Sequence, residues 1–195
     1  MKKYLFLFVV AVISAFATRT QNLAVEINYV ASDPTVLKPV IFYTPGVVLK
    51  WDDFKGKPEK NSDAAAVTNA GIGFKMSFHS KDKLATLNIK IDCNFSISDS
   101  WVKKGMTTDY ILMHEQHHFD ITYLYAMKFM HDLKTASYTM SNYSKVIQKI
   151  YYNNQTALLA MQNQYDDETK HSQINAMQEI WNKKINNEIA ALSTQ

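Results

Sequence analysis

The sequence His-Glu-Gln-His-His at residues 114–118 combines residue types and a spacing that could do chemistry. Side chains four positions apart on a helix share one face, with Cβ atoms about 6 Å apart. His114 and His118 can therefore bind one tetrahedral zinc ion through imidazole nitrogens, and Glu115 can take a proton from a water at the metal. The alternative is a pair of hydrogen-bonded core histidines beside a surface glutamate.

Helical periodicity around this motif indicates which way its side chains point. Ile111, Ile121 and Tyr125 continue the stripe that carries the two histidines, so we expect the metal-binding face to point inward. His117 is expected to be solvated or to contact a ligand rather than to bind the metal. Asp120 lies about 200 degrees around the helix from the second histidine. We expect it to orient a neighbouring group, or to form a buried cap or ion pair.

A catalytic zinc needs a third protein ligand, and residues 165–171 offer the candidates. If the first two helices form an antiparallel hairpin that turns near Met140, this segment returns to the level of the two histidines. Asp166 fits that register best, His171 is favoured because zinc prefers nitrogen, and Glu168 is a further candidate. The alternative is an ordinary helix end with acidic surface residues.

Three aromatic residues near these motifs have different expected roles. Tyr165 precedes the candidate ligands, where its phenolic hydroxyl could donate to an oxyanion. Trp51 and Trp101 are expected in the core or at a sheet edge rather than against a substrate.

Residues 26–98 predict strands separated by turns. Apolar residues alternate with polar ones from Ala85 to Ile97, and a similar alternation runs from Ala70 to Phe78. We expect these two half-buried strands to be neighbours in one antiparallel sheet. The segment Ala85–Ile97 is the predicted edge along which an extended peptide could add as a strand.

Residues 107–192 predict three helices, because the apolar period changes to about 3.6 after Gly105. The first should begin near Thr107 or Thr108, either of which can cap it, and should reach Lys134. The others are expected over 143–165 and 173–192. The fold class is therefore α+β, with an N-terminal antiparallel or mixed β-sheet followed by a helical half.

The N-terminus predicts an exported protein. A short basic head and an apolar run typical of a signal peptide occupy residues 1–17, and cleavage is expected after Ala17. Residues 18–195 are long enough for one domain, without stable membrane insertion after cleavage. The single cysteine, Cys93, is expected to be a small buried hydrophobe. The expected location is the periplasm or the exterior of a bacterium.

The charge of the chain argues against a nucleic-acid partner. The formal net charge of +3 falls to about +1 when Lys2 and Lys3 leave with the signal peptide, and no basic stripe follows. A peptide or protein substrate is the expected partner. The sequence leaves the oligomeric state open.

Several motifs together resemble the bacterial family known as domain of unknown function 922. They are Trp51-Asp-Asp-Phe-Lys-Gly-Lys-Pro58, Ser100-Trp-Val102, His114-Glu-Gln-His-His-Phe-Asp-Ile121, and Tyr165-Asp166 with Thr169 and His171. The resemblance covers about Leu49 to Ile185 and implies a zincin-like metallopeptidase fold with zinc-dependent peptide hydrolysis. Ser172 departs from the family pattern, which has glycine after His171.

The expected function is that of an exported zinc metallopeptidase. Zn²⁺ held by His114, His118 and a ligand from 166–171 would polarise the scissile carbonyl, with Glu115 as general base and Tyr165 or an unliganded histidine at the oxyanion. Two alternatives remain: a non-catalytic exported binding protein stabilised by zinc, and an envelope structural domain without metal.

Overall fold

The strand-rich half forms a four-stranded mixed sheet in the computed structural model, which describes residues 22–81 and 84–192. The central strand β5 (Leu84–Ser96) pairs antiparallel with β4 (Ala70–Lys81) along its whole length. Its other edge is shared by β1 (Asn22–Tyr29), which is parallel, and β2 (Val40–Phe42), which is antiparallel. The prediction that β4 and β5 are antiparallel neighbours is confirmed. The predicted signal peptide lies outside the described residues.

The central position of β5 corrects the prediction that it offers a free edge to a peptide. Alternation of side chains identifies a strand with one buried face, but edge and centre differ in backbone pairing, which the alternation does not encode. Both edges of β5 are already paired.

A second, two-stranded sheet lies beside the first. Its strands β3 (Ala66–Val67) and β6 (Trp101–Val102) are antiparallel. A short 3-10 helix, η1 (Trp51–Asp53), lies in the connection from β2 to β3. Trp101 is buried and Trp51 packs against the ring of Phe54, so both tryptophans are core aromatics as predicted.

Three helices follow the sheet, as the change of period predicts. They are α1 (Asp109–Thr135), α2 (Tyr143–Thr169) and α3 (Asn175–Leu192). The hydroxyl of Thr108 accepts a hydrogen bond from the Ile111 amide, which caps the start of α1. α2 continues four residues beyond its predicted end at Tyr165, and this extra turn contains Asp166.

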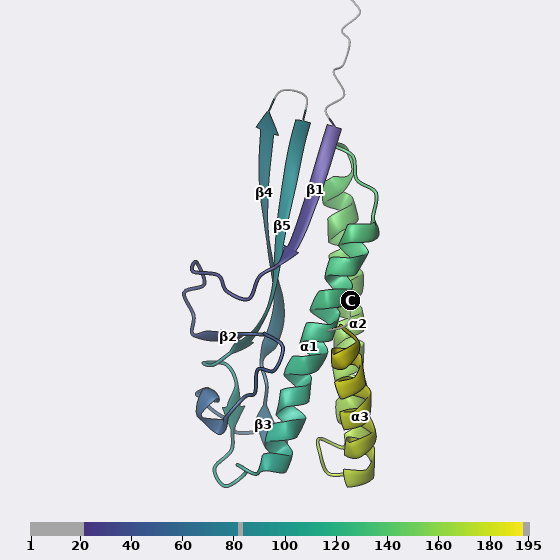
Figure 1. Cartoon of the computed structure of the whole chain (residues 1–195). Coiled ribbons are helices and arrows are strands. Elements are labelled where there is room, and N and C mark those ends of the chain that lie inside the picture. Colours follow the sequence, from purple (N-terminus) through teal and green to yellow (C-terminus); the bar gives the residue numbers. More distant parts are fainter. Residues whose placement is uncertain (1–21, 82–83, 193–195) are drawn as a thin grey trace, which may run out of the picture.

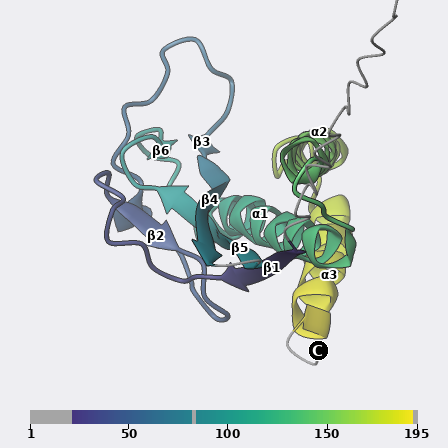
Figure 2. The same cartoon turned by 90° about the horizontal axis from the view of Figure 1, so that it is seen from above.

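α1 is the layer between the sheet and the other two helices (Figures 1 and 2). It contacts the strands on one side and both α2 and α3 on the other. The apolar face of β5 is buried beneath it, with these residues at most 2 % exposed: Ala85, Leu87, Ile89, Ile91, Cys93 and Phe95. Because α1 is covered on two sides, the side chains on those two faces are held between the sheet on one side and α2 and α3 on the other.

The apolar residues of the sheet and the three helices form one contiguous cluster. The described part of the chain, residues 22–81 and 84–192, contains no helix with the length and apolar character needed to span a membrane. The fold is α+β, a mixed sheet followed by three helices, as predicted.

Phe129 joins the sheet to both long helices and gives a test of this packing. Its ring is fully buried and meets Phe74 of β4 and Tyr151 of α2. Phe129→Ala should lower the free energy of unfolding by about 3–5 kcal/mol, because it leaves a cavity at the junction of three elements. Chemical denaturation measures the change. Tyr152→Ala, at a residue 71 % exposed, should change it by less than about 0.5 kcal/mol. Equal effects would contradict the packing described.

Candidate metal centre

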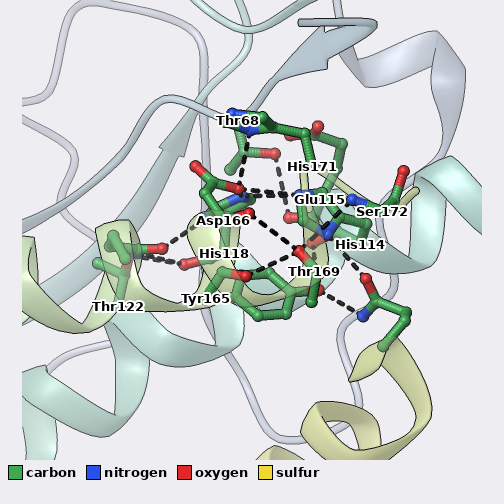
Figure 3. Close-up of polar contacts among 12 residues, drawn as sticks. Thr68, His114, Glu115, His118, Thr122, Tyr165, Asp166, Thr169, His171 and Ser172 are labelled. Carbon is green, nitrogen blue, oxygen red and sulfur yellow. Dashed lines mark hydrogen bonds and ion pairs between the residues drawn. The ribbon is translucent and has the colours of Figure 1, made fainter. Parts of the chain in front are cut away.

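Three side chains from α1 and α2 converge on one point, as Figure 3 shows. The Nε2 atoms of His114 and His118 are 3.2 Å apart, and Oδ1 of Asp166 lies 3.1 Å and 3.0 Å from them. Ligand atoms of a tetrahedral zinc with bonds near 2.0 Å are separated by about 3.3 Å. The spacing is therefore close to that of three ligands around one ion, and this group could hold a metal.

Two glutamines hold the histidine rings with their Nε2 atoms facing this point. Gln162 accepts from Nδ1 of His118, while its own Nε2 donates to the His118 carbonyl at 2.9 Å. Gln178 of α3 accepts from Nδ1 of His114 at 2.9 Å, and its Nε2 donates to the Tyr165 hydroxyl at 2.7 Å. The NH₂ group of each amide donates to another acceptor, so the amide oxygen faces the ring. Each Nδ1 must therefore carry the hydrogen of this bond. In a neutral ring, Nε2 then presents a lone pair inward, whereas in a protonated ring it donates to Oδ1 of Asp166.

The charge at this point calls for a cation. Two inward lone pairs and a carboxylate repel one another unless a proton or a metal ion lies between them. Burial lowers the pKa of His118, but its hydrogen bond to Asp166 and the charges of Glu115 and Asp166 outweigh burial and raise that pKa to about 9. For the Asp166 carboxyl, burial raises the pKa, but the hydrogen bonds from His114 and His118 together have the larger effect and lower that pKa. A divalent cation supplies the same compensation as the proton.

Glu115 lies beside this group with part of its carboxylate unsatisfied. Its side chain is buried, and Oε2 has no hydrogen-bond partner. A buried carboxylate oxygen without a partner is costly unless it has a ligand or water to bind. The donor set, its spacing and this oxygen fit a metal with a bound water, as the motif predicts.

A cleft of about 320 Å³ opens beside His114, His118 and Asp166, the candidate metal-binding group. One wall is the segment from Ala64 to Ala70, which includes β3, and the opposite wall comes from the helices. Thr68 fixes the first wall to α1, because its hydroxyl donates to the Glu115 carbonyl at 3.0 Å. The residues that line the cleft from the helical side are Glu115, His118, Gln162, Asp166 and His171.

Of the candidates for a third ligand, Asp166 joins the two histidines. His171 is nearby but not part of the converging group: its Nδ1 lies 3.3 Å from Oδ1 of Asp166, and its side chain is 57 % exposed. Glu168 is directed elsewhere, since its carboxylate accepts from Trp181 of α3 and from Gln164. The group that the structure brings together agrees with the register of the helical hairpin rather than with the preference of zinc for nitrogen.

Tyr165 supports the site by packing against the ring of His114. Its ring stacks on that of His114 with centroids 4.6 Å apart, and its buried hydroxyl donates to the His114 carbonyl at 3.3 Å. The same hydroxyl accepts from Gln178. These contacts favour a positioning role, and no contact in the structure supports the predicted donation to an oxyanion.

Asp120 and His117 form a separate buried network on the other side of α1. The Asp120 carboxylate accepts from Nδ1 of His117, from the Tyr43 hydroxyl and from Gln116, each at 2.9 Å. Gln116 in turn accepts from the Leu49 amide, which ties the segment before η1 to α1. As predicted, neither Asp120 nor His117 belongs to the metal-binding group, and Asp120 orients its neighbours.

The end of α2 adopts an unusual backbone conformation. Lys170 and His171 have φ of 50° and Ser172 has φ of 70°, the left-handed region in which L-residues are strained. Glycine adopts this region without penalty, so the glycine that the resemblance implies at the position of Ser172 would relieve strain here. The turn brings His171 back toward Asp166 despite the substitution.

Gln162 and Gln178 are the supporting residues that the sequence did not reveal. Gln162 precedes Asp166 by one helical turn, so it shares the face of that ligand, and this spacing was an available signal. Gln178 had no local signal, because its contact with His114 joins residues 64 positions apart.

Comparison with known proteins identifies the family. The model of a bacterial protein family of unknown function, DUF922, matches residues 55–172, which include all of the metal-binding group. The chain belongs to this family. No curated protein and no solved structure gives a significant match.

Replacing Asp166 tests the identity of the third ligand. Asp166→Ala should lower zinc affinity by more than the roughly 100-fold that loss of a supporting residue costs, because it removes the only anionic ligand. Competition with a chromophoric chelator measures the affinity. The matched control is Asp167→Ala, because Asp167 is the next residue along α2 and is exposed. If His171→Ala abolishes binding and Asp166→Ala does not, Asp166 is not the ligand.

Gln162 provides a second test, of the support for His118. Gln162→Ala removes the acceptor for Nδ1 and should weaken zinc binding by about 10–100-fold while the fold is retained. Gln164→Ala, at an exposed position on the same helix, should leave the affinity unchanged. Titration of both purified proteins with zinc makes the comparison, and equal affinities would show that the ring needs no such support.

Proposed function

We propose that this chain is an exported zinc-dependent peptidase. The observation that carries the proposal is the unpartnered Oε2 of buried Glu115 beside the His114, His118 and Asp166 group, at the wall of a cleft. Two histidines and a carboxylate are a donor set that zinc accepts, and three protein ligands leave one coordination position open. The signal-peptide pattern of residues 1–17 supports export.

The roles of the residues follow from their positions. Zinc bound by three protein ligands would supply Lewis acidity for the scissile carbonyl and for the attacking water. Glu115 accepts the proton of that water and passes it to the leaving amine. His171, exposed at the rim and unengaged by zinc, could donate to the developing oxyanion, and this role replaces the one predicted for Tyr165.

The β3 segment is the structural feature suited to align a peptide. Lys103 donates to the Ala65 carbonyl, and Ala66 pairs with Val102 in the same register. Hydrogen-bonded pairs alternate with non-bonded pairs in an antiparallel ladder, so Ala66 directs its own N–H and C=O away from β6. Since Ala66 also lines the cleft, these groups can pair with an extended substrate backbone.

A second candidate function is that of a zinc-stabilised binding protein without catalysis. The proximity of His171 to Asp166 favours it, because a small movement of the exposed ring would add a fourth protein ligand. Four protein ligands would leave no position for water. The number of protein ligands in the zinc-bound protein, measured by X-ray absorption, separates the two functions.

Glu115→Gln tests the proposed peptidase directly. The change keeps the shape of the side chain but removes the base, so hydrolysis of quenched fluorescent casein should fall by about 10²–10⁴-fold. Zinc content, measured by elemental analysis, should stay at one per chain. The control Glu59→Gln, at an exposed glutamate, should cleave like the parent. Undiminished cleavage by Glu115→Gln would remove Glu115 from the mechanism.

A further inference from the structure

One edge of the sheets runs continuously from β3 into β4 and is unpaired. β3 pairs only with β6 and β4 pairs only with β5 among residues 22–81 and 84–192. Thr68 and Asn69 alone separate the two strands, so the chain passes from the small sheet to the large one over the metal centre. The edges of β3 and β4 that face away from β6 and β5 therefore form one continuous edge that begins at the cleft.

The register shows which backbone groups of β4 lie on this edge. The Ser96 amide donates to the Asn69 carbonyl, so Asn69 and every second residue after it bond to β5. Between Ala70 and Phe78, the residues that alternate with them direct their N–H and C=O groups to the other edge of β4, and they are Ala70, Ile72, Phe74, Met76 and Phe78. The hydrogen bonds on the other side of β5 support this register, because the Ile91 and Cys93 carbonyls accept from the amides of Val30 and Tyr43 and so point away from β4.

The outer part of this edge is exposed and apolar. Met76 is 49 % exposed and Phe78 is 43 % exposed, although the alternation of β4 predicts that both are covered. Proteins normally protect a long edge with a proline or a charged side chain that points along it. Lys75 does not serve this purpose, since its ammonium group pairs with Asp33 and Thr35. An unprotected edge of this length is a feature of strand-addition sites.

We propose that the β4 edge is a binding site for an extended, apolar polypeptide that continues into the metal cleft. Ala70 both lines the cleft and begins β4, so the two sites are contiguous. From Ala70 to Phe78 the edge spans about 26 Å, which fits roughly eight substrate residues. An added extended backbone can pair with its alternating N–H and C=O groups along this whole length. Binding here rests on the edge alone, whereas cleavage of the bound chain rests on the proposed peptidase function.

The first experiment tests backbone pairing with the full-length Glu115→Gln protein, so that cleavage does not consume the ligand. Fluorescent dodecapeptides of alternating valine and threonine are N-methylated at odd positions or at even positions. Pairing uses every second N–H of an added strand. One series should therefore lose at least 10-fold in affinity, by fluorescence anisotropy, while the other binds like the unmethylated peptide. Equal affinities of the two series, or no binding by any peptide, would overturn the proposal.

The second experiment places the site on β4. Met76→Lys puts a charge on the apolar side of the edge and should weaken peptide binding at least 10-fold. Ser77→Lys is the matched control, since it adds the same charge to the opposite face of the strand and should bind like the parent. Equal affinities of the two variants would place the site elsewhere. A parent dimer that Met76→Lys dissociates would show that the edge pairs with a second copy, which also overturns the proposal.

The two proposals fail in different ways. If Glu115→Gln binds the peptides with the expected methylation pattern but the parent hydrolyses none of them, the edge site stands and the peptidase function fails. If the parent cleaves peptides and Met76→Lys cleaves them with the same KM, the peptidase stands and the edge site fails.

Discussion

The mutual repulsion of two imidazole lone pairs and a carboxylate is the constraint on which the rest of this structure depends. His114, His118 and Asp166 hold their ligand atoms within 3.0–3.2 Å of one another, which is tolerable only with positive charge between them. Such an arrangement must be imposed by its surroundings. Gln162 and Gln178 hold the rings by their outer nitrogens, and Tyr165 stacks against one of them. All three helices therefore contribute to a group whose ligands come from two.

The layered fold explains how these supports reach one place. α1 is covered by the sheet on one side and by α2 and α3 on the other (Figure 2). A histidine of α1 that faces α2 and α3 is therefore surrounded by residues of those two helices. The residues of the opposite side, such as Asp120, instead bond to segments that precede the sheet's central strand. The same helix thus separates a polar group that could hold a metal ion from a polar structural network. The Asp120 network is buried, and the metal-site group is half-buried at the cleft; Nε2 of His117 and Oε2 of Glu115 are buried atoms without a hydrogen-bond partner in them.

The sequence predicted the parts of this architecture that local spacing encodes. The helical histidine pair, the α+β order and the β4–β5 neighbours follow from periods of about 3.6 and 2. The length of a helical hairpin pointed to Asp166, while the preference of zinc for nitrogen favoured His171, and the structure brings Asp166 to the two histidines. The central position of β5 and the role of Gln178 could not be predicted, because they depend on which distant segments pair and pack. The exposure of Met76 and Phe78 was missed for the same reason, since alternation does not say how far the covering helix extends.

The link between His114 and Asp166 joins positions 52 residues apart in a chain that contains a single cysteine. A bound ion would close that long loop as a covalent crosslink does, and closing a loop removes more entropy from the unfolded chain as the loop grows. The metal would then crosslink α1 to α2 in addition to taking part in catalysis. A chain of this kind gains rigidity when it acquires its ion, so metal supply and the completion of folding would be coupled events.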